Sequence, residues 1–197
     1  MGAQDRFVTI VSGLPRSGTS MMMRMLEAGG IGALIDDIRE ADIDNPRGYY
    51  EYEPVKSTRD DPRWLESASG RVVKMVYSLL YDLVDGHQYR VVFMRRDLEE
   101  ILRSQQKMLD RLGTREESVS DDAMRQLFTA EIDKCRKFLR DDPRFSFLEV
   151  DYNKLLSGPG QLVEEVDRFL GGGLDREAMA AVVDPSLYRN RAESQPC

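Results

Sequence analysis

The chain has 197 residues, of which 41% are hydrophobic and 32% charged, so it has the composition of a globular protein and enough length for one domain with a core. Asp and Glu outnumber Lys and Arg by 35 to 28, a net charge of −7, which argues against nucleic acid or a polyanionic sugar as the main partner but leaves room for a local basic pocket. The two cysteines do not suggest a disulfide framework, no stretch has the length and apolarity of a membrane span, and no signal-peptide pattern opens the chain, so we expect a cytoplasmic protein without a membrane span.

Short apolar runs alternate with helical patterns along the chain. The apolar runs predict five strands, at residues 7–11, 31–35, 71–76, 89–94 and 145–150. Helical spacing predicts helices at residues 19–28, 97–112, 120–139 and around 162–169, and glycines end the first and the last of these. We therefore expect a single α/β domain over residues 1–197, with three layers: a mostly parallel sheet of about five strands and helices on both faces.

The turn after the first predicted strand is the most informative segment. It has the spacing Gly-x-x-x-x-Gly, from Gly13 to Gly18, and leads into a helix. Glycines let the backbone curl around an anion, and a helix N-terminus adds partial positive charge, so the turn predicts a P-loop-like phosphate cradle. Thr19 stands where a nucleoside triphosphatase would have the Lys that reaches the outer phosphates of ATP. Arg16 offers a planar cation suited to oxyanions instead; a tight turn without a ligand is the alternative.

A second anion site is indicated where the fourth predicted strand meets the next helix. Arg95 and Arg96 precede Asp97, the expected helix cap, and Ser104 lies eight residues after Arg96. Two arginines beside a helix N-terminus favour anion binding, and Ser104, two turns into the helix, can add a hydroxyl. The alternative is an arginine pair on a solvated helix start, with Ser104 incidental.

The first of these motifs, Pro15-Arg16-Ser17-Gly18-Thr19-Ser20, resembles the 5′-phosphosulfate loop of sulfotransferases that use 3′-phosphoadenosine 5′-phosphosulfate (PAPS), in which the pattern is Pro-Lys/Arg-Ser-Gly-Thr-Thr/Ser. The resemblance implies that the five residues from Arg16 to Ser20 hold the 5′-phosphate and the sulfuryl group. It implies transfer of that group to a hydroxyl or amine of an unidentified acceptor, with 3′-phosphoadenosine 5′-phosphate (PAP) as the product and no metal. It spans about residues 7–170.

The same resemblance implies further site residues. The family binds the 3′-phosphate with an Arg at a strand end and a Ser eight residues on, here Arg96 and Ser104, or Arg95 if the strand ends one residue earlier. Tyr152 resembles a family tyrosine near the adenine, with a packed aromatic as the alternative. Lys74 resembles a strand lysine that approaches the sulfuryl group, and the resemblance implies that Lys74, Arg16 and the loop amides stabilise the charge on the moving group. The alternative is an edge-strand lysine, although a charge in an apolar strand needs a partner.

The base that removes the acceptor proton is the main departure from the family pattern. Well-known members have His two residues after the strand lysine, where this chain has Val76. The only histidine, His87, precedes a predicted strand and so lies at the end away from ligands, which predicts a surface residue. Related branches use Glu, and a carboxylate among tyrosines can acquire a raised pKa. We predict Glu51 as the base, with Glu53 as the alternative and an exposed acidic segment as a further one.

Several questions stay open from the sequence. The family's late Arg-Lys-Gly motif is missing, and Arg189 and Arg191 are candidates to replace it at the 3′-phosphate, with a frayed basic tail as the alternative. A dimerisation motif of the family is also missing, so the oligomeric state is open. The net charge favours a small-molecule, lipid or peptide acceptor. A nucleotide kinase-like phosphotransferase and a PAP- or PAPS-binding module without catalysis are the two rival functions.

Overall fold

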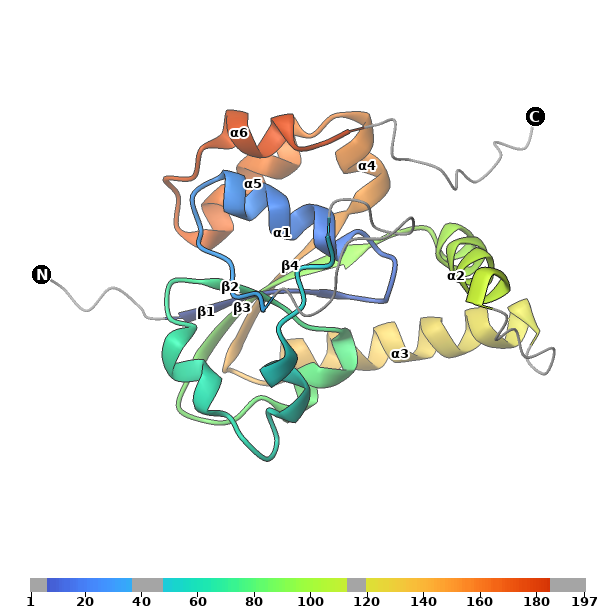
Figure 1. Cartoon of the computed structure of the whole chain (residues 1–197), viewed down its shortest axis with the longest axis horizontal. Coiled ribbons are helices and arrows are strands. Elements are labelled where there is room, and N and C mark those ends of the chain that lie inside the picture. Colours follow the sequence, from blue (N-terminus) through green and yellow to red (C-terminus); the bar gives the residue numbers. More distant parts are fainter. Residues whose placement is uncertain (1–6, 37–47, 113–119, 185–197) are drawn as a thin grey trace, which may run out of the picture.

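A four-stranded parallel sheet lies at the centre of the computed structural model, which describes residues 7–36, 48–112 and 120–184 (Figure 1). The strands are β1 (Phe7–Gly13), β2 (Val72–Lys74), β3 (Gln88–Arg95) and β4 (Phe145–Asp151). They lie in the order β2-β1-β3-β4, and all three pairings are parallel. After β1, the chain adds β2 on one side of β1 and then crosses over to add β3 on the other side of β1. In open α/β sheets, ligands bind where such a reversal occurs, at the carboxyl ends of the two strands, so the topology favours a ligand site after β1 and β3.

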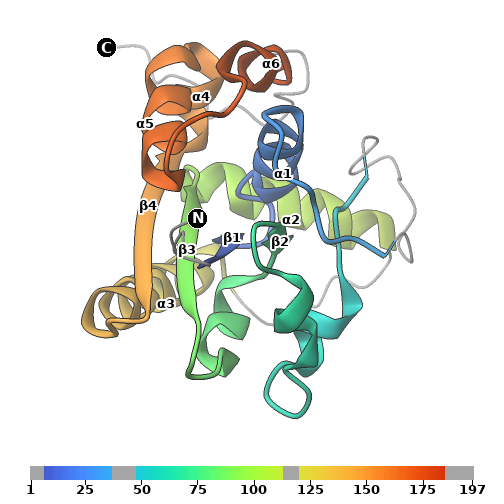
Figure 2. The ribbon, with the colours of Figure 1, turned by 90° about the vertical axis from the view of Figure 1, so that its left-hand side faces the viewer.

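Helices cover both faces of the sheet, which confirms the predicted three-layer α/β fold (Figures 1 and 2). One face carries α1 (Thr19–Ala28), α4 (Tyr152–Ser157), α5 (Gly160–Leu170) and α6 (Arg176–Ala181). The other face carries α3 (Asp121–Asp141) and three short 3₁₀ helices, Glu53–Ser57, Arg63–Ser67 and Tyr77–Asp82. Helix α2 (Leu98–Leu112) packs on α3 and lies beyond the carboxyl end of β3. None of the helices in the described segments is both long and apolar enough to cross a membrane.

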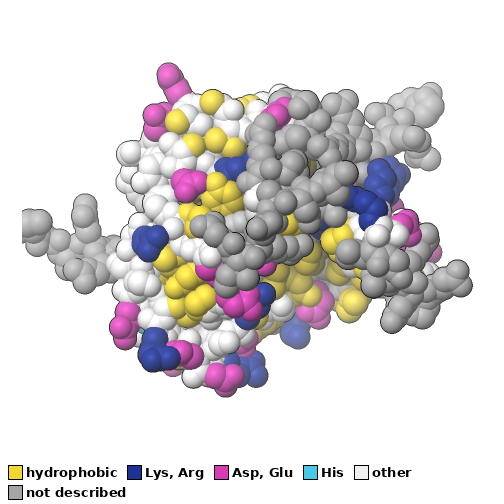
Figure 3. Space-filling model, in the orientation of Figure 1, with side chains coloured by type: hydrophobic (Ala, Val, Ile, Leu, Met, Phe, Trp, Pro, Cys, Tyr) yellow, Lys and Arg dark blue, Asp and Glu magenta, His cyan; other side chains and the backbone are white. Residues whose placement is uncertain are grey.

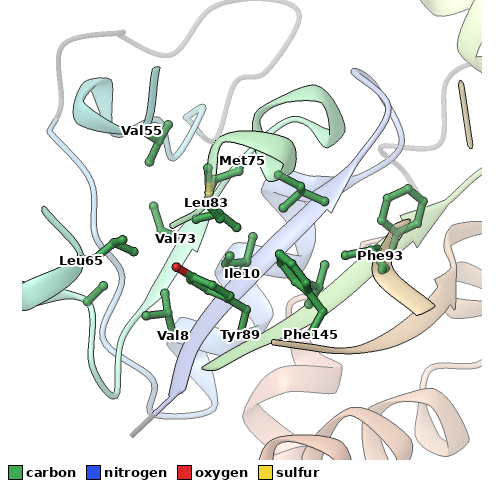
Figure 4. Close-up of a cluster of buried hydrophobic side chains, with 14 of the residues drawn as sticks. Val8, Ile10, Val55, Leu65, Val73, Met75, Leu83, Tyr89, Phe93 and Phe145 are labelled. Carbon is green, nitrogen blue, oxygen red and sulfur yellow. The ribbon is translucent and has the colours of Figure 1, made fainter. Parts of the chain in front are cut away.

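The side chains of each strand alternate between two hydrophobic cores. On β3, Val91 and Phe93 belong to the core shared with α3 and the 3₁₀ helices (Figure 4), whereas Val92 and Met94 belong to the core shared with α1 and α5. Full burial of one such side chain stabilises a fold by about 1.5–3 kcal/mol. Because both faces are covered, the central strand β3 has a continuous apolar run, residues 91–94, rather than an alternating sequence.

The predicted strand at residues 31–35 is wrong, and the sheet has four strands instead of five. Ala33 forms only an isolated parallel bridge with Val72. The N–H group of Leu34 donates to the Val72 carbonyl at 2.8 Å, and one further bond joins Val72 to this segment. The neighbouring strand β2 is only three residues long, so residues 31–35 have few backbone groups with which to form a longer ladder.

The other predicted elements are present, and their ends follow from local capping. Asp97 caps α2 by accepting from the N–H of Glu99 at 2.9 Å, as the sequence predicted. Ser120 does the same for α3. Gly171, with φ of 107°, ends α5. The short helix α4 was not predicted; it begins directly after β4, where Asp151 is its N-cap.

Candidate active site

The loop at residues 13–20 lies at the carboxyl edge of the sheet. Gly13 and Gly18 have φ of 147° and 100°, which favour glycine. A Cβ on Gly13 would lie 2.6 Å from the carbonyl oxygen of Met94, so the loop starts in close contact with β3. No side chain caps α1, and the N–H groups of Thr19 and Ser20 in its first turn have no partner within the helix. The loop therefore has the geometry of an anion cradle.

The hydroxyl of Ser17 is the buried polar group of this cradle. Ser17 is 1% exposed, and its Oγ has no hydrogen-bond partner among the described residues. Leaving a buried hydroxyl without a partner costs about 1–3 kcal/mol, a cost that a bound oxyanion would remove. The cradle thus fits an oxyanion in charge and in hydrogen-bonding capacity.

The guanidinium of Arg16 lies at α2. Arg16 has a left-handed backbone, φ 71°, which is uncommon outside glycine. Its Nε donates to Ser104 Oγ at 2.5 Å, and its Nη1 lies 3.8 Å from the sulfur of Met108. Ser104 is 2% exposed. One residue of the predicted 5′-phosphosulfate loop is therefore in direct contact with a residue of the predicted 3′-phosphate site.

Arg96 joins the end of β3 to the same loop. Its Nη1 donates to the Arg16 carbonyl at 3.2 Å, and its guanidinium lies 4.6 Å from the ring centroid of Tyr152. Arg95 instead has a half-exposed side chain that pairs with Glu149 at 3.5 Å. The structure thus brings Arg96, and not Arg95, into contact with the cradle.

A buried carboxylate that the sequence analysis missed orients Arg96. Glu100 is 1% exposed and pairs with Arg96 Nε at 2.9 Å. Its other oxygen accepts from Asn153 Nδ2 at 3.0 Å, and Asn153 Oδ1 accepts from the N–H of Asp97 at 3.3 Å. The spacing of four residues between Arg96 and Glu100 on a helix start was the available sequence signal.

Tyr152 lies beneath the loop. It opens α4 directly after β4 and is 8% exposed. A Cβ on Gly18 would lie 2.8 Å from Cε2 of this ring, so the loop packs against the Tyr152 ring. Burial raises the pKa of the Tyr152 hydroxyl, which therefore stays protonated. The ring packs on the loop, and its contact with adenine stays a prediction.

Lys74 and Glu51 lie together at the carboxyl end of β2. Nζ of Lys74 is 3.9 Å from Oε1 of Glu51, and the side chains are 12% and 26% exposed. Nζ also donates to the carbonyl of Tyr49, which accepts a second hydrogen bond from Ser20 Oγ at 3.2 Å. The segment around Tyr49 therefore connects the strand lysine to the cradle.

The remaining candidates lie away from this cluster. Glu53 has a 52% exposed side chain and pairs with Lys56 at 2.6 Å, so Glu51 is the carboxylate of the two that lies at Lys74. His87 immediately precedes β3, so it lies at the amino end of this strand, opposite the end that carries the cradle. Arg189 and Arg191 lie outside the described residues. Within the described segments, no group of three or more His, Cys, Asp or Glu is arranged to hold a metal ion.

The family model for the sulfotransferase domain matches residues 8–195, nearly the whole chain. The chain belongs to the sulfotransferase domain family. The resemblance first noted in the loop is thereby confirmed, and this sulfotransferase domain is an enzyme that transfers a sulfuryl group.

Two solved sulfotransferase domains share the fold. The domain from the Synechococcus PCC 7002 olefin synthase has a TM-score of 0.57 and 14% identity, and the alignment covers 100% of this chain and 92% of that one. The domain from the curacin biosynthetic pathway has a TM-score of 0.55 and 14% identity, with 96% and 93% covered. No curated protein matches the chain. The two structures support the architecture of this sulfotransferase domain.

Proposed function

We propose that this sulfotransferase domain moves the sulfuryl group of PAPS to a hydroxyl or amine, with the 5′-phosphosulfate in the loop at residues 13–20 and the 3′-phosphate at Arg96 and Ser104. The observation behind the proposal is the junction between these two anion sites. Arg96 bonds the backbone of Arg16 at 3.2 Å, and Arg16 bonds Ser104 at 2.5 Å. PAPS has phosphate groups at both ends of one ribose, so its binding requires two anion sites that adjoin.

Within the cradle, the hydroxyl of Ser17 and the N–H groups of Gly18, Thr19 and Ser20 would hold the 5′ group. These donors belong to the backbone or to a buried side chain, so they are held in position before the ligand arrives. Tyr152, on which the loop packs, is proposed to lie near the adenine.

The reaction breaks the S–O bond to the 5′-phosphate and forms a bond from sulfur to the acceptor oxygen or nitrogen. PAP leaves with the electron pair of the broken bond, and the acceptor proton passes to Glu51. Lys74 and the loop amides stabilise the negative charge that develops on the moving group; one such donor typically contributes about 10²- to 10³-fold in rate. We propose no metal, because these cations and amides supply the neutralising charge.

The acceptor is proposed only as a small molecule, lipid or peptide. The methionines at residues 21–25 are core residues, since Met22, Met23 and Met25 are 0% exposed against the sheet. Val76, two residues after Lys74, is an apolar side chain at the surface and is 39% exposed. A single domain over residues 1–197 and a cytoplasmic location stay predictions.

A thermal-shift comparison of PAP with adenosine 5′-phosphate tests the proposal. Saturation at about 100 times Kd stabilises a protein by about 2.7 kcal/mol, which gives a clear rise in Tm. We expect PAP to stabilise the domain far more than adenosine 5′-phosphate, Arg96→Ala to abolish this difference, and Arg95→Ala to retain it.

Other outcomes identify the rival functions. Equal stabilisation by both nucleotides would contradict a 3′-phosphate site. Stabilisation by ATP with magnesium, without an effect of PAP, would indicate a phosphotransferase. Tight PAP binding without sulfuryl transfer to any member of a broad acceptor panel would indicate a binding module that lacks catalysis.

A further inference from the structure

We propose that Arg16 determines specificity for the 3′-phosphate, although it belongs to the loop that holds the 5′-phosphosulfate. This inference rests on the proposed function and concerns which end of the nucleotide the Arg16 guanidinium binds. From the sequence, Arg16 was expected to hold the 5′-phosphate and the sulfuryl group. Its contacts in the structure are with the helix that we propose to bind the other phosphate.

The side chain of Arg16 is directed toward α2. Both contacts of the guanidinium described above, with Ser104 Oγ at 2.5 Å and Met108 Sδ at 3.8 Å, are with residues of α2. Ser104 lies two turns into α2, and its buried hydroxyl belongs to the 3′-phosphate site proposed above. The backbone of Arg16 is part of the cradle, whereas its charged guanidinium lies at α2.

The charge of a 3′-phosphate also requires a cation besides Arg96. A phosphate monoester carries about −1.5 to −2 charges near pH 7. Arg96 is paired at 2.9 Å with Glu100, which is buried, so this pair has no net charge to offer. A dianion at this position therefore needs another cation, and within the described residues the Arg16 guanidinium is in hydrogen-bond contact with Ser104.

The hydrogen-bonding groups of Ser104, Arg16 and Arg96 are arranged to bind a phosphate. The hydroxyl of Ser104 accepts from Arg16 Nε and keeps its own proton to donate to a phosphate oxygen. Arg96 Nη1 bonds the Arg16 carbonyl at 3.2 Å, which fixes the two arginines relative to each other. Charged donors arranged in this way make the short, strong hydrogen bonds that phosphates accept. Arg16 thus takes the part of a second basic residue at the 3′-phosphate.

The test measures discrimination between two ligands in the full chain. Calorimetric Kd values for PAP and for adenosine 5′-phosphate are compared in the wild type, Arg16→Ala and Arg16→Gly. The glycine variant accepts the φ of 71° without strain, so it separates loss of the guanidinium from backbone effects. The matched control is Arg103→Ala, which removes the same charge from the neighbour of Ser104. Arg103 is exposed on α2, where basic side chains gather on the surface (Figure 3).

We expect both Arg16 variants to lose about tenfold or more in affinity for PAP, as for the loss of a hydrogen bond to a charged group. Their affinity for adenosine 5′-phosphate should change little, so the ratio of the two Kd values falls. The control Arg103→Ala should have the wild-type affinity for both nucleotides. In a double-mutant cycle with Ser104→Ala, the two losses should not add, because the side chains act on the same phosphate.

Parallel losses for both nucleotides would overturn the inference, since they would assign Arg16 to the 5′ end and leave the proposed function intact. Unchanged PAP affinity in the Arg16 variants would overturn it as well. A wild type that does not prefer PAP to adenosine 5′-phosphate would instead overturn the proposed function itself.

Discussion

The carboxylate of Glu51 lies 3.9 Å from the ammonium group of Lys74, at the carboxyl end of β2. This separation is longer than the 2.7–3.2 Å of an ordinary hydrogen bond, so the two groups are close without forming a tight pair. A carboxylate and a cation in this arrangement are suited to the proposed reaction, in which the acceptor gives up a proton beside a group that gains negative charge. Strand β2 ends at Lys74, and it lies next to β1, which the cradle loop follows.

Replacement of Glu51 by Gln should abolish turnover and leave PAP affinity nearly unchanged, because the amide cannot take a proton at this position. A general base contributes about 10²- to 10⁴-fold in rate, which sets the expected loss in kcat. The measurement is PAP release from PAPS with an acceptor identified by the panel, together with calorimetric PAP binding. Glu53→Gln is the comparison variant. Full activity of Glu51→Gln, or an equal loss in Glu53→Gln, would show that Glu51 is not the base.

Removal of the Lys74 charge should separate catalysis from product binding. In Lys74→Met we expect kcat to fall by about 10²- to 10³-fold, because the cation would act on charge that develops in transfer. PAP affinity should change much less, since PAP has already lost the sulfuryl group. Lys56→Met, which removes a 54% exposed lysine paired with Glu53, is the control. A large loss of PAP affinity with unchanged kcat would assign Lys74 to nucleotide binding instead.

The sequence was sufficient to locate the turn that we propose as the cradle and the strand end that we propose as the second anion site. The Gly13 and Gly18 spacing and the apolar run before it define the turn, and local capping by Asp97 defines the start of α2. The choice between Arg95 and Arg96 depends on tertiary structure. Arg95 is the last residue of β3, and its side chain reaches Glu149 on β4 rather than the loop.

The direction of the Arg16 side chain had no sequence signal. It depends on a left-handed backbone at a residue other than glycine and on the placement of α2, whose contacts are remote in the chain. The missed helix α4 and the wrongly predicted strand at residues 31–35 are both short. For such segments the hydrophobic pattern does not decide the structure, because a few tertiary hydrogen bonds outweigh it.

Gly18→Ala should destabilise the fold more than the matched change Gly30→Ala. Both glycines have a positive φ, 100° and 104°, so the backbone strain is similar. A Cβ at position 18 would overlap the Tyr152 ring, whereas a Cβ at position 30 would have nothing within 4 Å. Forcing an extra carbon into packed surroundings costs about 1–3 kcal/mol, which is the expected difference in unfolding free energy. Urea denaturation followed by the fluorescence of the single tryptophan, Trp64, measures it. Equal destabilisation of the two variants would show that Tyr152 does not pack on the loop.

Asp167→Asn should reduce the loss of stability in acid. The Leu174 N–H group, at 2.9 Å from the carboxylate, and Arg176, at 2.7 Å, hold the pKa of Asp167 below its usual value. The unfolded chain therefore binds a proton more readily than the folded one. The stabilisation is complete above the unfolded pKa of about 3.9 and is lost as the pH falls through the lower folded pKa.

The Asn variant keeps an acceptor for the Leu174 N–H but has no carboxylate to titrate. Its unfolding free energy should be lower than that of the wild type near neutral pH, and the gap should narrow as the pH falls from about 5 to about 3. Trp64 fluorescence in urea at a series of pH values gives both curves. Asp60→Asn, a change at an exposed aspartate, controls for net charge. A gap that stays constant with pH would mean that the charge of Asp167 does not stabilise the turn between α5 and α6, and that the carboxylate acts there only as a hydrogen-bond acceptor.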